Sequence, residues 1–472
     1  MTNRRNVLKF GVLGTLASSM PTLSLAAIGD QRFELRAQKT PYKLSGDNNQ
    51  LSDLWLYNGT TPGPEIRVKQ GDRVRVHFVN ELDEPTSVHW HGIRISNAMD
   101  GVSDLTQNPV PPGGTFDYDF VVPDAGTFWY HAHNKSWEQV ARGLYGPLIV
   151  EEPVPVFDRD HDITLVIDDW RIDNDGALHL ASLGAFMDWT HSGRLGNWLT
   201  VNGGSQPEFT LNANENYRVR LINASNARVL QIDPRSLGAQ VIGYDGFVFE
   251  APQSSSSSIA IAPAQRVDLL IRSKGNASGQ IPETGGVSLE ELSGREPVRF
   301  ATFKFHSNEN QTTAKPVQLK PNKILTPDLT SATSVPLIMR GGAMGRIGKA
   351  IYNGKELKRG DFQRTKQVWT FNNIANLAEE PLFRIKRGQT VLIQSDNQTG
   401  WLHGMHVHGH HFQIISRNGQ QQDEPLWRDT FLIDRNEKVD IAFVAENPGK
   451  WLLHCHMLEH AAAGMQTWFE VI

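Results

Sequence analysis

The single cysteine of this 472-residue chain, Cys455, lies between two histidines in the segment HCHMLEHAAAGM near the C-terminus. The apolar residues WLL before it follow Pro448 and Gly449, a pattern that predicts a buried β-strand ending in a loop. Because alternate side chains of a strand face opposite sides, His454 and His456 face one way and Cys455 faces the other. One strand can therefore serve two metal sites.

A thiolate, two imidazoles and a weakly held thioether are the ligands of an electron-transfer copper. Cys455, His460 and Met465 supply three of these four groups. The segment WLHGMHVHGHHF, which begins at Trp401, offers His403 as the fourth. The pattern therefore predicts one mononuclear copper site.

Histidines also recur in pairs that are two residues apart, in HWHG, in WYHAH, in MHVH and around the cysteine. Neutral imidazole suits copper as well as zinc and iron. A lone pair of this kind is usually without function, and zinc sites take three protein ligands plus water rather than a dozen in linked sets. Copper is therefore the preferred metal. The four pairs are His89 and His91, His131 and His133, His406 and His408, and His454 and His456.

In this order the motifs resemble those of the multicopper oxidases, the family of laccases and bacterial cuprous oxidases. The resemblance implies four copper ions and the reduction of dioxygen to water by electrons from a small-molecule donor or Cu(I). It assigns the type 1 copper to His403, Cys455, His460 and Met465. It assigns the type 2 copper to His89 and His406, and the type 3 pair to His91, His131, His133, His408, His454 and His456.

Several acidic residues near these motifs are candidates for proton transfer or for orienting a ligand. Asp100, in the MDG after the first motif, sits where the family carries a catalytic acid, although an Asp before Gly is also common in turns. Many bacterial relatives place a second acid where this chain has Ala461. Glu459 is either an orienting residue or a proton donor. Asp429 either bonds a ligand imidazole, pairs with Arg428 or lies in a turn. His410 and His411 are interpreted as packing or supporting residues, since no ligand position remains for them.

The N-terminal residues 1–26 resemble an export signal, with adjacent Arg4 and Arg5, a mildly apolar stretch and small residues near Ala26. The twin arginines favour the Tat export machinery, and an ordinary secretory signal is the alternative. Either signal predicts a periplasmic protein. No stretch reaches the roughly 18 apolar residues of a membrane helix, so we expect no stable membrane insertion.

Net charge and cysteine content exclude other classes. The net charge is −5 and the basic residues are dispersed, which argues against a nucleic-acid partner. One cysteine allows no internal disulfide, and in an oxidising compartment metal ligation would protect its sulfur.

A repeated pattern predicts the domain organisation. The stretches beginning PEIRVKQGDRVRV at Pro64, PEFTLNANENYRV at Pro207 and PLFRIKRGQTVLI at Pro381 each read as two alternating strands around a polar turn. Short strands and frequent Gly and Pro indicate an all-β fold, and the family resemblance makes it three cupredoxin-like Greek-key β-sandwich domains. We expect them at residues 27–153, 154–308 and 335–472, with a linker at 309–334. The second, which has no paired histidines, is predicted to be a spacer.

The main functional hypothesis is a laccase-like oxidase of phenols or aromatic amines. A cuprous oxidase serving copper tolerance is the closest alternative, although the nine methionines are scattered. A two-domain nitrite reductase is disfavoured because such enzymes lack histidines on both sides of the cysteine. A non-enzymatic scaffold of export or cell division would have lost ligands, and none is lost here.

Overall fold

The computed structural model describes residues 29–44, 50–212, 215–272, 286–306, 316–345 and 347–472. The predicted signal, residues 1–26, lies outside this range, as does part of the predicted linker. Within the described residues no helix combines the length and the apolar character needed to cross a bilayer. The elements are almost all strands, so the all-β prediction is confirmed.

The strands form three two-sheet sandwiches, which follow one another along the chain. The sheets of the first sandwich are β2(Ser52–Tyr57)-β1(Asp30–Tyr42)-β4(Arg73–Asn80)-β6(Thr115–Val121) and β3(Ile66–Lys69)-β8(Tyr145–Glu151)-β7(Gly126–Ala132)-β5(Val88–His91). The sheets of the second are β10(Trp198–Val201)-β9(Asp162–Trp170)-β12(Asn216–Asn223)-β17(Arg266–Arg272)-β14(Gln240–Tyr244)-β15(Phe247–Gln253) and β11(Glu208–Asn212)-β19(Val298–His306)-β18(Val287–Glu291)-β13(Leu230–Ile232)-β16(Ile259–Ile261).

The third sandwich carries the C-terminal motifs. Its first sheet is β23(Trp369–Phe371)-β20(Thr333–Gly341)-β25(Thr390–Asn397)-β31(Lys438–Val444)-β27(Phe412–Arg417)-β28(Gln420–Gln421), with β29(Trp427–Arg428) also on β27. Its second is β24(Arg384–Ile385)-β33(Gln466–Val471)-β32(Gly449–Cys455)-β26(His403–Val407)-β30(Thr430–Ile433). A small hairpin, β21(Ile351–Tyr352) with β22(Lys355–Glu356), stands apart from both sheets. Strand β20 begins at Thr333, inside the predicted linker.

The three repeats found in the sequence occupy the same place in each sandwich. Each forms two strands, β3 and β4, β11 and β12, or β24 and β25, and the two strands enter different sheets. The first strand pairs in parallel with β8, β19 or β33, and the second pairs in parallel with β1, β9 or β20. The repeat therefore predicted a shared topology as well as shared strands.

Alternation along these strands explains which side chains form the cores. In β4, Val74, Val76 and Phe78 are buried while the charged residues between them face outward. The matching Tyr217, Val219 and Leu221 of β12 are buried as well. Strand β4 thus shows the period-two alternation of a strand with one face on a core, whereas β12 is buried on both faces.

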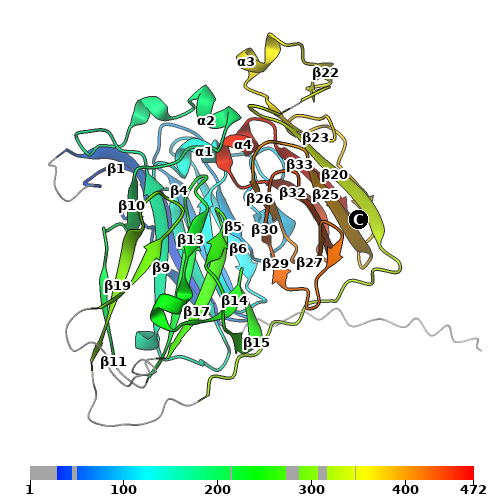
Figure 1. Ribbon diagram of the computed structural model, residues 1–472. Coiled ribbons are helices and arrows are strands. Elements are labelled where there is room, and N and C mark those ends of the chain that lie inside the picture. Colours follow the sequence, from blue (N-terminus) through cyan, green and yellow to red (C-terminus); the bar gives the residue numbers. More distant parts are fainter. Residues whose placement is uncertain (1–28, 45–49, 213–214, 273–285, 307–315, 346) are drawn as a thin grey trace, which may run out of the picture.

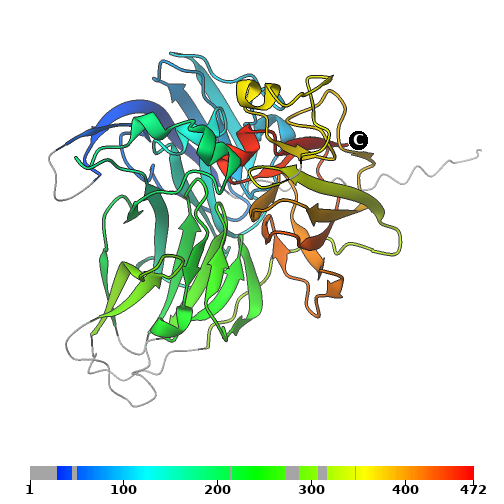
Figure 2. The ribbon, with the colours of Figure 1, turned by 45° about the horizontal axis from the view of Figure 1, so that its top comes forward.

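Three short helices gather where the sandwiches meet (Figure 1). They are α1(Ser136–Gln139), α2(Phe186–Thr190) and α4(Leu458–Ala462), and α4 packs against both of the others. Figures 1 and 2 show the green second sandwich beside the yellow-to-red third, with the blue and cyan first sandwich behind them. The remaining α-helix of the described residues, α3(Asp361–Thr365), projects away from this junction (Figure 1). The 3-10 turns are η1(Asn97–Met99), η2(Arg159–His161), η3(Leu180–Ser182) and η4(Pro234–Leu237).

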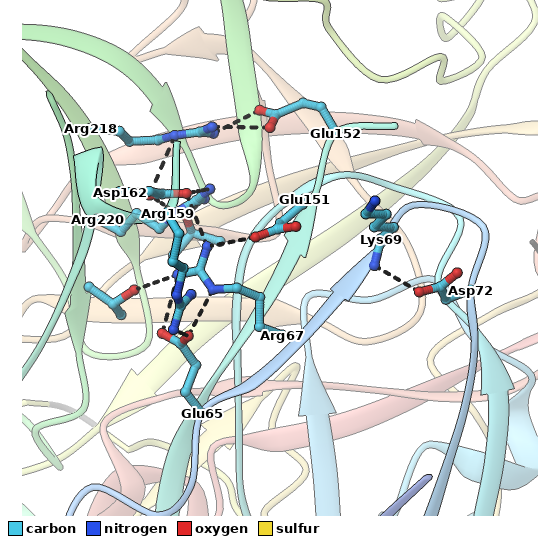
Figure 3. A network of polar contacts seen from close by, with 12 residues as sticks. Glu65, Arg67, Lys69, Asp72, Glu151, Glu152, Arg159, Asp162, Arg218 and Arg220 are labelled. Atoms are coloured by element: carbon cyan, nitrogen blue, oxygen red, sulfur yellow. Dashed lines mark hydrogen bonds and ion pairs between the residues drawn. The ribbon is translucent and has the colours of Figure 1, made fainter. Parts of the chain in front are cut away.

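A buried network of charges joins the first two sandwiches (Figure 3). Asp162, at the start of β9, accepts hydrogen bonds from Arg67 of β3 at 3.1 Å and from Arg220 of β12 at 2.7 and 2.8 Å. Arg218 pairs with Glu152 at 2.7 and 3.0 Å. Charges are buried at acceptable cost only when they are paired in this way, so the network fixes how the two sandwiches meet.

Candidate metal centres

Strand pairing brings the histidine motifs together two by two. In the first sandwich His89 of β5 lies opposite His131 of β7. In the third, His406 of β26 lies opposite His454 of β32, and Met405 lies opposite Cys455. Residues directly opposite in an antiparallel pair are about 4.5–5.5 Å apart, so each sandwich presents a compact patch of imidazoles.

His403, Cys455, His460 and Met465 form one group in the third sandwich, which we name the type 1 set. The Cys455 sulfur lies 3.7 Å from His403 Nδ1 and 3.9 Å from His460 Nδ1, and the two nitrogens are 3.1 Å apart. The Cys455 amide donates to the Met465 carbonyl at 3.0 Å. All four residues are completely buried.

The outer nitrogens of these imidazoles are already engaged. His460 Nε2–H donates to the His191 carbonyl at 2.7 Å, and His403 Nε2 contacts Thr399 Oγ1 at 2.9 Å. Because the Thr399 hydroxyl is directed to the Asn397 side chain at 2.7 Å, it accepts from His403. Both Nδ1 atoms therefore carry lone pairs that face each other and the sulfur, which is the donor arrangement that a cation satisfies.

Burial raises the pKa of Cys455 to about 12. The metal-free protein therefore keeps a neutral thiol, and a metal must displace its proton on binding.

The eight paired histidines form a second group, the histidine cluster, to which the first and third sandwiches contribute four each. Their nitrogens approach within 4.8 Å of one another in three sets, of which the first two share His91. The sets are His89, His91 and His406; His91, His131 and His456; and His133, His408 and His454. The last two sets contain the six residues that the family resemblance assigns to the type 3 pair, and His89 and His406 of the first set are the two that it assigns to type 2.

Backbone and carboxylate oxygens hold the outer nitrogens of six of the eight cluster histidines. Backbone carbonyls accept hydrogen bonds of 2.8 to 3.1 Å from the Nδ1 atoms of His89, His131, His406 and His454. The inner nitrogens then point at one another, with 3.1 Å between His408 Nε2 and His454 Nε2. Four inner nitrogens have no hydrogen-bond partner among the described residues: His89 Nε2, His91 Nδ1, His133 Nε2 and His406 Nε2.

Unpaired lone pairs that converge in a buried space are costly unless a cation binds them. Burial and the neighbouring imidazoles also lower the pKa of His408 well below its usual value, and burial lowers that of His454 to about 4. These two imidazoles are therefore neutral and ready to bind metal at neutral pH. The donor set fits copper.

Asp100 supports the cluster from the turn after η1. Its carboxylate accepts a hydrogen bond from His408 Nδ1 at 3.0 Å, and its carbonyl accepts the one from His89. Gly101 follows with φ of +80°, and a side chain there would collide with the Val88 carbonyl. Asp100 thus both ends a turn and orients imidazoles from two sandwiches.

Asp429 is paired with Arg266 of the second sandwich, and the predicted alternative of a pair with Arg428 is wrong. Arg266 donates to Asp429 Oδ1 at 2.8 Å and to its second oxygen, and both side chains are fully buried. Asp429 Oδ1 also lies 3.3 Å from His91 Nε2, so the alternative of an imidazole contact is confirmed. Gly92 has φ of +86°, and a side chain there would meet this ion pair.

Other residues near the motifs serve the packing around them. Glu459 accepts from Asn226 Nδ2 at 2.8 Å and from the Arg194 amide at 3.1 Å, which ties α4 to the second sandwich. His411 contacts the Gly92 carbonyl at 2.6 Å, and His410 packs on Phe443, Trp451 and Phe469. Both behave as the sequence predicted. Sequence reasoning missed Arg266, Thr399 and the His191 carbonyl, because no motif marks them.

Two cavities lie near these groups. A smaller one of about 260 Å³ is lined by His133 and His454 of the cluster and by Ala461. A larger one of about 920 Å³ lies between the second and third sandwiches and reaches Met457. The Met457 amide donates to the Cys455 sulfur at 3.4 Å, so the larger cavity abuts the type 1 set.

Three β-sandwiches that bury a Cys-His-His-Met set beside an eight-histidine cluster define a copper-binding oxidoreductase. Family models described as multicopper oxidase match residues 38–154, 161–280 and 353–472. Laccase-1 of Botryotinia fuckeliana is 30% identical over 91% of this chain and 82% of its own length. The chain belongs to the multicopper oxidases, and it is a copper-dependent enzyme that reduces dioxygen.

Solved structures agree with this assignment and with the cupredoxin-like fold. The multi-copper oxidase from Pseudomonas thermotolerans superposes with a TM-score of 0.79 at 31% identity, covering 94% of this chain and 100% of that one. A multicopper oxidase from Campylobacter jejuni, described as a metallo-oxidase, superposes with a TM-score of 0.75 at 25% identity, covering 93% of this chain and 91% of its own.

Proposed function

We propose that the protein is a laccase-like oxidase that removes single electrons from phenols or aromatic amines and passes them to dioxygen. The type 1 set would hold the copper that takes up electrons, and the histidine cluster would hold one type 2 and two type 3 ions where dioxygen is reduced. Four donors that each lose one electron and one proton match the four electrons and four protons that turn dioxygen into two waters.

The observation that carries the proposal is the shared strand β32. Cys455 ends this strand inside the type 1 set, while His454 and His456 on either side belong to the cluster. Three consecutive residues thus connect the two groups through covalent bonds. No other arrangement in the described residues joins them by so short a path.

An aromatic donor is supported by the larger cavity. Its volume of about 920 Å³ is in the range of small-molecule sites, and Tyr244, Trp401 and Phe431 are among its lining residues. Met457 is the only methionine among the described residues that line it. The cavity therefore offers aromatic surface rather than a group of thioethers.

Asp100 is proposed as the proton donor to reduced oxygen. Its carboxylate is buried and already bonds one cluster imidazole, which holds it beside the inner nitrogens. The smaller cavity against His133 and His454 is the proposed route for dioxygen. Arg4 and Arg5 support export by the Tat machinery to the periplasm, which cell fractionation of the tagged full-length chain would test.

A cuprous oxidase is the second candidate, because two methionines near the type 1 set are exposed. Met187, on α2, is 63% exposed and Met344 is 93% exposed, and the neighbouring Ala343 amide donates to the Thr190 carbonyl of α2. Thioether sulfur suits Cu(I). Met339, which the sequence placed near Met344, is instead buried in β20.

Oxygen uptake by the copper-loaded protein separates these candidates. We expect uptake with syringol, a simple phenol, to exceed that with Cu(I) at equal concentration. Faster turnover of Cu(I), and its loss in a variant with Met187→Leu and Met344→Leu, would favour the cuprous oxidase. A blue, copper-replete sample that consumes no oxygen with any donor would favour a non-enzymatic scaffold.

A further inference from the structure

The larger cavity contains a buried positive charge that has no ionic partner. Arg428, in β29, lines the cavity and is only 9% exposed. Its guanidinium donates to the Trp427 carbonyl at 3.0 Å and lies 3.8 Å from the centre of the Tyr244 ring. Among the described residues, no carboxylate lies within salt-bridge distance of it.

Arg266, which lies close by, is a buried arginine whose charge and N–H groups are paired, and it serves as a comparison for Arg428. It is fully buried, pairs with both oxygens of Asp429 and donates to the carbonyls of Thr127 and Ala264. Asp245 lies 3.6 Å from it as well. Asp245 and Asp429 are therefore engaged by Arg266, and they act on Arg428 only from a longer distance.

The other charged residues of the cavity leave an excess of positive charge. Arg228 pairs with Asp169 at 2.8 Å, outside the lining, and Arg417 pairs with Glu437 at 2.8 Å. Arg435 and Asp434 are exposed at the rim. The lining residues thus include four arginines and two acids, although the whole chain has a net charge of −5. This concentration of charge is local to the cavity.

A guanidinium with free N–H groups in a partly dry, aromatic cavity is suited to a carboxylate, which it can bind through two parallel hydrogen bonds. The apolar walls, which include Ile259, Ile414 and Phe431, suit the ring of an aromatic molecule. Met457 and Leu402 place that ring next to Cys455 and His403.

We infer that this cavity binds phenols or anilines that carry a carboxylate, with Arg428 holding the carboxylate and the ring lying against Met457. The inference rests on the proposed function and names the donor class for the same site. The bound phenol loses one electron and its hydroxyl proton, with dioxygen as the final oxidant. Arg428 is a binding residue and takes no part in the electron transfer.

The test compares syringate with syringol, which differ by the carboxylate, on the copper-loaded protein. We expect Arg428→Gln to raise the KM for syringate about tenfold or more, since hydrogen bonds to charged groups are strong. The KM for syringol should change by less than about twofold, and kcat should stay similar for both. Arg428→Lys should recover part of the preference, because it keeps the charge and loses the planar fork. Equal changes for the two donors would overturn the inference.

Binding is measured separately with benzoate, which has no oxidisable hydroxyl, by calorimetry on copper-loaded protein. Benzoate should bind the wild type, compete with syringol, and bind Arg428→Gln about tenfold more weakly, whereas neutral benzyl alcohol should not show this difference. The matched control is Arg235→Gln, an exposed arginine paired with Asp233 outside the cavity.

Several outcomes separate failure of this inference from failure of the proposed function. If benzoate inhibits without competing with syringol, the anion binds elsewhere and the inference is overturned. If benzoate does not inhibit the wild type at all, the inference is overturned as well, and this measurement requires no variant. If neither phenol supports oxygen uptake, the proposed function fails. Benzoate calorimetry then still decides whether Arg428 forms an anion site.

Discussion

The type 1 set and the histidine cluster are built from the same side chains but depend on different parts of the molecule. All four residues of the type 1 set come from the third sandwich, three of them from the last 18 residues of the chain and the fourth, His403, from β26. The cluster takes four histidines from the first sandwich and four from the third. One group can form when a single domain folds, whereas the other needs two domains to dock.

The second sandwich supplies none of these ligands and still supports both groups. Its His191 carbonyl orients His460, and its Arg266 holds Asp429 behind His91. The same fold thus carries ligands in the first and third sandwiches and buried supporting groups in the second, which illustrates that function depends on the grafted site rather than on the fold.

The largest expected effect comes from cutting the link between the two groups. Cys455→Ser should abolish the blue thiolate-copper absorption and the turnover of outside donors, because the type 1 set loses its sulfur. The eight cluster histidines remain, so metal analysis should find one copper fewer per chain. A variant that keeps full turnover would mean that electrons enter elsewhere.

Domain docking is tested by removing Arg266. Arg266→Met leaves the Asp429 carboxylate buried without its partner, and breaking a buried pair costs about 3–5 kcal/mol. We expect the cluster to lose copper first while the blue absorption of the type 1 set persists, measured by spectroscopy during titration with a chelator. Loss of copper from both groups at the same chelator concentration would contradict the claim that only the cluster depends on domain docking. Arg235→Gln, at an exposed pair, should leave copper retention unchanged.

A smaller effect is expected inside the cluster, at Asp100. Asp100→Asn keeps the size of the side chain and removes its acidity, and losing a general acid typically slows a reaction about 10²-fold or more. Oxygen reduction should slow, while anaerobic bleaching of the blue absorption by syringol should be unchanged. Turnover equal to that of the wild type would remove the proposed role of Asp100 as a proton donor.

The smallest effect concerns the pH dependence of the copper-free protein, in which both groups should behave alike. Burial lowers the pKa of His454 and of His460 to about 4, from 6.5 in an unfolded chain. Below pH 6.5 these histidines bind protons in the unfolded state but not in the folded state. The free energy of unfolding is therefore greatest above pH 6.5 and falls toward pH 4. Each histidine contributes at most about 1.4 kcal/mol per pH unit.

Urea unfolding at several pH values measures this slope. His454→Gln, in the cluster, and His460→Gln, in the type 1 set, should each flatten it by a similar amount. A stability that does not change between pH 7 and pH 4.5 would show that these imidazoles are not held neutral by burial.

That the histidine and cysteine motifs come together could be predicted from the sequence, because strand periodicity constrains them locally and the family resemblance relates the motifs to one another. His454, Cys455 and His456 alternate on one strand, and the repeats around Val74 and Val219 predicted matching strands in each sandwich. The groups that position the ligands could not be predicted, because they depend on how the sandwiches pack. Arg266 meets Asp429 only across a domain interface. The sequence around Arg266 therefore does not reveal that it is paired, just as the sequence around Arg428 does not reveal that it has no ionic partner.

The most direct test of the central claim is a crystal of copper-loaded protein measured with anomalous diffraction on both sides of the copper edge. We expect one copper among His403, Cys455 and His460, and three more among the eight histidines of the cluster. A Cys455 sulfur without a metal, or a cluster without copper, would contradict it.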